Sequence, residues 1–328
     1  MEHPGLLPSH QADRAHCGTI AMGSGNKTRR GPGWIDLQLH KLLRLWQLGA
    51  CRGTPMAIIA ITQYPGTRAF ELGRLLSDRL GYRFLTADDL ISTASRIYGV
   101  TPEQAVIADE RRPHFWERLK TDTQRFVPLF RAVALKEMAR GRVILYGRSV
   151  GHLMPDYGQC LRVRLAGPIK LRVIEVMREE NLSAAAAERR VRDYDREVRA
   201  RVQTLFDVDL EDPAVHHLTI NTFATPLPVV TDLLALAAEE LDRQATPEQR
   251  GLLQDTALAA QVRAALMIHP KIGQAPVEVV CERGFVHVTG PGLVPPWDRL
   301  VGDVARTIDG VSFVEVNPEE IAAPVRPA

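Results

Sequence analysis

The first residues whose types could do chemistry form a short loop, Gly66-Thr67-Arg68, between an apolar run and a segment with helical periodicity. Such a loop can bind phosphate through its backbone N–H groups and the amino end of the following helix, usually with a lysine that reaches the terminal phosphates. No lysine lies between Lys41 and Lys120, so Thr67 and Arg68 are the available hydroxyl and cation. The loop is therefore a candidate phosphate site, and an ordinary strand-to-helix turn is the alternative.

Arginines form the second group of candidates. Arg148 directly follows a buried apolar run, where its guanidinium can bind two phosphate oxygens at once or cap strand-end carbonyls at the surface. Arg192 and Arg199 belong to an arginine-rich segment with helical periodicity. Because Glu188 and Asp195 precede them by four residues each, an exposed helix with salt bridges is the alternative there.

These candidates are positioned by apolar strands that alternate with helices. Strands are predicted at residues 57–62, 82–85, 143–146, 161–165 and 218–221. Continuous apolar strands separated by helices indicate an α/β fold with a parallel sheet and helices on both faces. Ligands of such sheets bind at the carboxyl ends of the strands, where residues 66–68 and Arg148 are expected.

The pattern changes along the chain. Residues 1–55 show no periodicity and are predicted to be a disordered leader, and residues 56–243 form the α/β domain. Residues 244–254 are polar and are interpreted as a linker. Residues 255–317 contain two helices and three alternating strands, which indicates a small α+β domain with one solvated sheet face. Residues 318–328 are expected to form a tail.

Composition excludes several classes of protein. Of 328 residues, 45% are apolar and 24% are charged, which is ordinary for a globular protein, and the net charge of +2 does not indicate nucleic-acid binding. No apolar run approaches the roughly 18 residues of a membrane helix. The four cysteines stand apart, so neither a zinc site nor a disulfide framework is expected, and the neighbours His216 and His217 should point apart rather than bind metal. A reduced, cytoplasmic setting follows.

Residues 56–243 resemble the cytidylate kinase-like family, whose members are relatives of nucleoside monophosphate kinases. The segments that carry the resemblance occur in family order: residues 60–64, 71–76, 81–84, 109–110, 147–148, 161–168 and 220–222. The resemblance implies a P-loop kinase-like sheet. It also implies phosphoryl transfer from ATP, with Mg²⁺, to a nucleoside monophosphate such as CMP or dCMP.

The resemblance implies roles for individual residues. Arg148 matches an arginine that such kinases use on the acceptor phosphate, and Asp109 lies where the family carries acidic residues near the acceptor. Arg192 and Arg199 fall in the mobile lid, where arginines neutralise charge on the transferring phosphoryl group and exclude water.

The donor side departs from the family pattern. Gly66, Thr67 and Arg68 would hold the donor phosphates, but the family loop reads Gly-Ser-Gly-Gly-Arg-Glu, and here the stretch is Gly-Thr-Arg-Ala-Phe-Glu. Side chains at Arg68 and Phe70 would crowd a backbone that must approach phosphate closely. The second hypothesis is therefore a catalytically degenerate, regulatory protein that binds a nucleotide or another anion.

Residues 255–317 resemble a BON domain. The resemblance rests on glycines that punctuate alternating strands, at Gly284, Gly290 and Gly310, with valines between them. BON domains are regarded as binding modules without catalytic residues. This resemblance implies a second ligand or a membrane surface as a partner for the carboxyl-terminal part of the chain.

Overall fold

The computed structural model describes residues 56–62, 64–99, 120–148, 150–153, 160–273 and 275–318. The leader (residues 1–55), Asp109 and all but the first residue of the tail (318–328) lie outside the described residues. No helix in the described part of the chain is long and apolar enough to cross a lipid bilayer.

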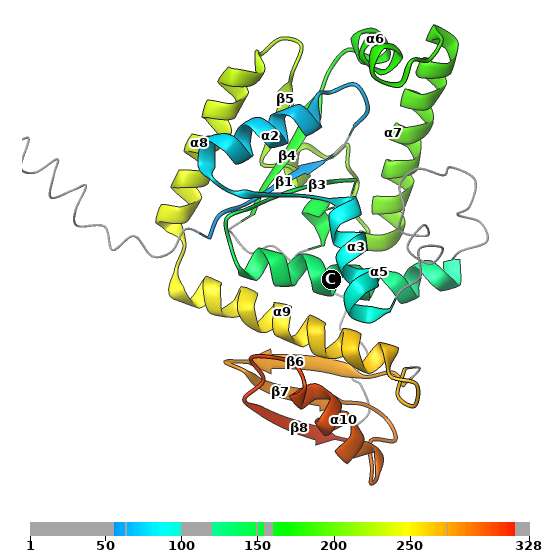
Figure 1. Ribbon diagram of the computed structural model, residues 1–328, viewed down its shortest axis with the longest axis vertical. Coiled ribbons are helices and arrows are strands. Elements are labelled where there is room, and N and C mark those ends of the chain that lie inside the picture. Colours follow the sequence, from blue (N-terminus) through cyan, green and yellow to red (C-terminus); the bar gives the residue numbers. More distant parts are fainter. Residues whose placement is uncertain are drawn as a thin grey trace, which may run out of the picture. The chain divides into compact units, whose positions relative to one another are not determined.

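A five-stranded parallel sheet forms the centre of the larger part (Figure 1). Its strand order is β2-β3-β1-β4-β5. The strands are β1 (Ile58–Thr62), β2 (Arg83–Thr86), β3 (Val143–Gly147), β4 (Cys160–Ala166) and β5 (Leu218–Asn221). All five residues of β1 are buried, as expected of a central strand that is covered on both faces. The predicted α/β fold with a parallel sheet is confirmed.

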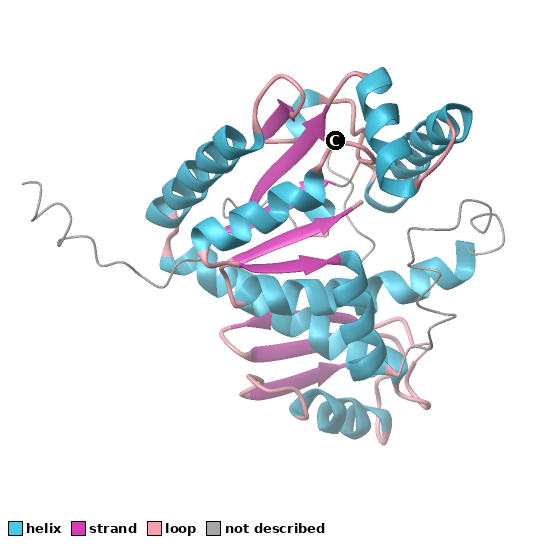
Figure 2. Cartoon of the chain, turned by 45° about the horizontal axis from the view of Figure 1, so that its top comes forward, coloured by secondary structure: helices cyan, strands magenta, loops and turns pink. Residues whose placement is uncertain are grey.

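Helices cover both faces of this sheet. One face packs on α2 (Ala69–Leu80) and α8 (Leu227–Gln244), and the other packs on α3 (Ala87–Tyr98) and α5 (Lys120–Ala139). The helices α6 (Ile169–Glu180) and α7 (Ala184–Phe206) pack against each other through Val176, Ala187 and Val191. Figure 2 shows the helices on the faces of the parallel sheet. The first turn of α6 also lies against Gly66, in the loop that follows β1 at the carboxyl end of that strand.

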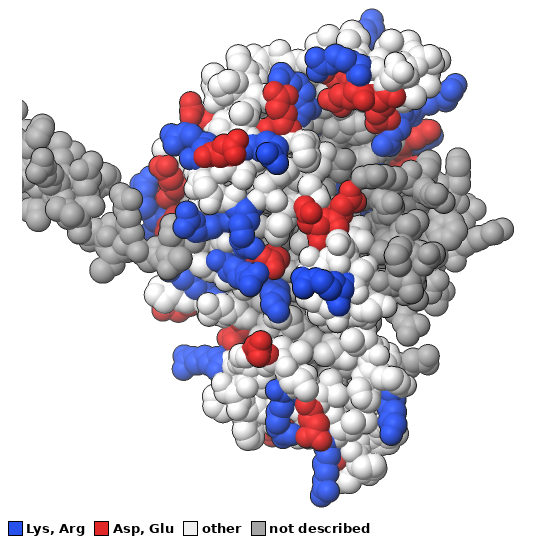
Figure 3. All heavy atoms as spheres, in the orientation of Figure 1, with Lys and Arg blue, Asp and Glu red and all other residues white. Residues whose placement is uncertain are grey.

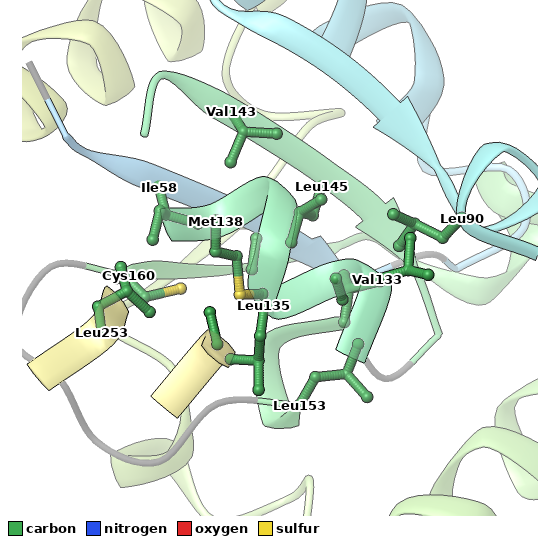
Figure 4. Packing of buried hydrophobic residues seen from close by; sticks show 14 of the residues in the cluster. Ile58, Leu90, Val133, Leu135, Met138, Val143, Leu145, Leu153, Cys160 and Leu253 are labelled. Atoms are coloured by element: carbon green, nitrogen blue, oxygen red, sulfur yellow. The ribbon is translucent and has the colours of Figure 1, made fainter. Parts of the chain in front are cut away.

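The prediction of a linker at residues 244–254 is wrong from Pro247 onward, because Pro247 begins a long helix, α9 (Pro247–Ile268). Thr246 caps this helix: its hydroxyl accepts the N–H of Gln249, whose side chain accepts the N–H of Thr246 in return. Proline at the first helical position completes a helix-start signal that the polar composition of this stretch obscured. Leu253 is fully buried in the cluster beneath the sheet, beside Met138 and Cys160 (Figure 4).

The small carboxyl-terminal sheet that the alternating pattern predicts is also present. Its strands β6 (Glu278–Glu282), β7 (Phe285–Thr289) and β8 (Phe313–Asn317) lie in sequence order, with α10 (Trp297–Arg306) between the last two along the chain. Its core includes Val262 and Leu266 from the second half of α9. One helix thus contributes side chains to the hydrophobic clusters of both parts.

Candidate functional site

The loop after β1 is tied down by its own hydrogen bonds. The hydroxyl and the backbone N–H of Thr67 both donate to the carbonyl oxygen of Tyr64, at 2.7 and 3.3 Å. The hydroxyl of Thr222, just after β5, donates to the carbonyl of Thr67 at 3.1 Å. Thr67 is fully buried, so its hydroxyl stabilises the turn and does not face a ligand in this conformation.

Gly66 is required by close packing of α6 on the loop. Its φ is 70°, in the left-handed region that favours glycine. A Cβ at this position would lie 2.2 Å from the carbonyl oxygen of Arg172, which is backbone and cannot move away alone. Gly66 therefore has a structural reason to be glycine that is independent of phosphate.

Arg68, the predicted donor-side cation, forms an ion pair with its neighbour on α2. Its Nε and one Nη donate to the two carboxylate oxygens of Glu71, at 2.9 and 2.7 Å. The hydrogen bond to Glu71 raises the pKa of the Arg68 guanidinium above its ordinary value. The side chain is 35% exposed, and such pairs contribute little to stability, so a phosphate could compete with Glu71 for the guanidinium.

Arg172, on α6, is the functional-site residue that sequence reasoning missed. Its two Nη atoms donate to both oxygens of Asp195 on α7, at 2.8 and 2.7 Å, and its Nε donates to the carbonyl of Pro65 at 3.0 Å. It is only 7% exposed. Arg172 thus joins α6, α7 and the loop after β1. Of the two helical pairs that the exposed-helix alternative offered, Glu188 with Arg192 is present, whereas Asp195 pairs with Arg172 and not with Arg199. No local spacing signals a partner 23 residues away.

Arg148 is buried beneath α7. It follows β3, is 3% exposed, and its guanidinium carbon lies 4.1 Å from the ring centroid of Tyr194. One Nη lies 3.6 Å from a carboxylate oxygen of Glu197. A cation over an aromatic face with a nearby carboxylate is a favourable setting for a buried charge. Arg148 is therefore not the surface arginine that the sequence left as an alternative.

Arg192 and Arg199 lie on the opposite side of α7 from Arg148. Seven residues apart, they differ by only about 20° around the helix, whereas Tyr194 lies roughly 200° from Arg192. Their side chains are 58% and 53% exposed, and they pair with Glu188 at 2.8 Å and Glu211 at 3.6 Å. The structure does not bring these two arginines together with Arg148. Figure 3 shows basic and acidic side chains interspersed over one face of the molecule.

The two neighbouring histidines point apart, as expected. The Nδ1 of His217 accepts the backbone N–H of Arg162 at 2.9 Å, while the ring of His216 is buried 6.1 Å from that of His152. Burial, with nearby cations such as Arg164, lowers the pKa of His216 to about 4. Within the described residues, no group of three or more His, Cys, Asp or Glu side chains is placed to hold a metal ion.

Comparison with known proteins decides the family. Residues 58–224, about half of the chain, match the model of the cytidylate kinase-like family. The chain belongs to this family. The cytidylate kinase of Halobacterium salinarum is 24% identical over 194 residues, covering 58% of this chain and 94% of that protein. The cytidylate kinase of Pyrococcus horikoshii is 22% identical over 185 residues, covering 56% and 90%.

Two solved structures share lower sequence identity with this family member. A gluconokinase from Sinorhizobium meliloti covers 58% of this chain and 99% of its own, with a TM-score of 0.36 and 18% identity. A shikimate kinase from Acinetobacter baumannii covers 56% of this chain and 94% of its own, with a TM-score of 0.34 and 18% identity. The family match ends at residue 224, so the BON-like character of residues 255–317 stays a prediction.

The family implies ATP and Mg²⁺, and the geometry of the loop shows whether its residues could hold them. A phosphate loop offers a cation to the terminal phosphates and a hydroxyl to the metal ion. Here the Thr67 hydroxyl is buried and donates to Tyr64, the guanidinium of Arg68 is paired with Glu71, and Arg172 backbone contacts Gly66. The loop in this conformation does not fit a triphosphate with its metal ion.

Proposed function

We propose that this family member binds the phosphate of a nucleoside monophosphate at Arg148 and does not transfer a phosphoryl group to it. The observation that carries the proposal is the burial of Arg148 at the carboxyl end of β3, beside the loop after β1. Ligands of open parallel sheets bind at this edge. The relatives named above are cytidylate kinases, which supports a monophosphate as the ligand.

The chemistry of binding is an exchange of counter-ions. Glu197 lies 3.6 Å from Arg148 and is a carboxylate that a bound phosphate would replace. A phosphate that presents two oxygens to the guanidinium would form two charge-assisted hydrogen bonds in a site with little water, where electrostatic attraction is stronger. Glu197 would then have to move toward solvent with α7.

The absence of transfer follows from the donor loop. Its hydroxyl is buried, its arginine is paired, and the chain has no lysine between Lys41 and Lys120. Phosphoryl transfer depends almost entirely on positioning and charge neutralisation, so a loop without a lysine, whose one arginine is already paired with Glu71, loses much of the catalytic effect. This proposal corresponds to a degenerate kinase-fold protein that keeps its acceptor side.

The second candidate is ATP- and Mg²⁺-dependent transfer to CMP or dCMP. It is favoured by the placement of Arg192 and Arg199 on one exposed face of α7, where they could close on a substrate as a lid. In that role the helix would have to turn or shift, because this face points away from Arg148.

Two measurements separate the candidates. Calorimetric titration with CMP should give binding that Arg148→Gln weakens at least tenfold, while the matched variant Arg192→Gln, with an exposed arginine, leaves it nearly unchanged. ATP consumption with CMP, dCMP, UMP and AMP should stay at background. Turnover with any of them would support the second candidate, and CMP affinity unaffected by Arg148→Gln in a folded variant would refute the first.

A further inference from the structure

The outer face of the small carboxyl-terminal sheet carries an exposed aromatic pair. Phe285 on β7 lies directly opposite Phe313 on β8, with ring centroids 5.9 Å apart. Val280 on β6 is paired with the next outward-facing residue of β7, His287. The three apolar side chains are 50%, 54% and 54% exposed, in the order Phe285, Phe313, Val280. We name the two phenylalanines, together with Val280 on the diagonal from Phe285, the Phe285–Phe313 patch.

The core of this sheet does not need these side chains. The opposite face packs on α9 and α10, and it is apolar on every strand: Val279, Cys281, Val286, Val288, Val314 and Val316. Val286 and Val288 are fully buried. An antiparallel or mixed sheet with one covered face normally alternates to polar residues on the other. Two phenylalanines at outward positions therefore depart from the pattern, and contiguous exposed apolar surface of this kind commonly marks an interaction site.

Three carboxylates lie at outward positions near the patch. The strand register places Glu282 directly beside Phe285, and Glu315 beside His287, whose Nδ1 lies 2.9 Å from it. Glu278, the next outward-facing residue of β6 after Val280, lies opposite Thr289. The outward positions of the three strands carry these three glutamates and no lysine or arginine; Arg283, in the turn between β6 and β7, is the adjacent cation.

We propose that this face docks a protein segment that presents apolar side chains flanked by lysine or arginine. The apolar centre would be buried by the partner, while the glutamates would pair with its cations and set its orientation. A second copy docking through the same face would bring like carboxylates together, and an anionic membrane would meet the same repulsion. The charge pattern thus selects a basic protein segment among the occupants of an apolar face.

The experiment uses the full chain and fluorescein-labelled octapeptides measured by fluorescence anisotropy. A peptide of alternating leucine and lysine should bind with a dissociation constant on the order of 10–100 µM. A leucine–glutamate peptide and a serine–lysine peptide should bind at least tenfold more weakly, since each lacks one of the two required properties.

Variants then assign the binding to the face. Phe285→Thr with Phe313→Thr keeps β-propensity and should weaken the leucine–lysine peptide at least tenfold, with unchanged circular dichroism. Val229→Thr, at an exposed valine of α8, is the matched control and should have no effect.

Several results would overturn the proposal. These are no binding of the leucine–lysine peptide, equal binding to the double Phe variant, Phe-dependent sedimentation with anionic phosphatidylglycerol vesicles, and Phe-dependent dimerisation in ultracentrifugation. The double variant retains the elements of the Arg148 site, so failure here is distinguishable from failure of monophosphate binding.

Discussion

Replacing Leu253 with alanine tests whether the first half of α9 is part of the hydrophobic core of the parallel sheet. Leu253 is fully buried among Met138, Cys160 and other side chains beneath the parallel sheet, whereas its neighbour Leu252 is 52% exposed. If residues 244–254 acted as a loose linker, the two substitutions would have similarly small effects. In this fold, only Leu253→Ala leaves a cavity in a core.

The magnitude follows from burial. Leucine-to-alanine substitutions in cores cost about 2–5 kcal/mol, because the transfer free energy of the removed atoms adds to the cost of the cavity. For Leu253, which loses contacts on all sides, we expect a loss of about 3 kcal/mol in the free energy of unfolding. Leu252→Ala should stay within roughly 0.5 kcal/mol, as is usual for exposed positions.

The assay is urea unfolding followed by far-ultraviolet circular dichroism, with melting temperature as a second readout. A loss of about 3 kcal/mol should lower the melting temperature by roughly 6–12 °C in a unit of this size. Truncation after Gln244 should destabilise the remaining sheet as well, because it removes Leu253 and Ala257 from the same cluster. Equal stability of Leu252→Ala and Leu253→Ala would refute the assignment of this segment to a packed helix.

Three further predictions concern the site. Because folding lowers the pKa of His216 to about 4, the stability that depends on its neutral ring is complete above about pH 6.5 and falls by about 3 kcal/mol as the pH drops toward 4. Urea unfolding at pH 7 and pH 4.5 measures this loss, and His216→Asn should reduce the difference between the two pH values. Arg172→Gln should lower the free energy of unfolding by about 3 kcal/mol, since it leaves Asp195 without its bidentate partner. Thermal unfolding measures this, and a loss no greater than that of the exposed Arg192→Gln would contradict a stabilising role of the Arg172–Asp195 pair. Gly66→Ala should lower the melting temperature by several degrees, and an unchanged value would show that α6 does not press on the loop.

Local sequence determined the strands and most of the helices. The runs at residues 57–62, 143–146 and 161–165 became β1, β3 and β4. The first two are almost continuously apolar because both of their faces are buried, whereas residues 161–165 alternate between apolar residues and arginine. The family assignment also came from short segments in order, and it is confirmed. The placement of Arg148 at a strand end followed from the same pattern.

Only the tertiary structure decided which charges meet. Arg172 and Asp195 are 23 residues apart, so no helical spacing relates them, and packing of α6 on α7 creates the pair. Packing likewise turned Tyr194 and Glu197 toward Arg148 and left Arg192 and Arg199 in solvent. Burial of Leu253 overrode the polar composition around it. Periodicity reports what each element prefers locally, but the partner of a side chain depends on elements that only the folded chain brings together.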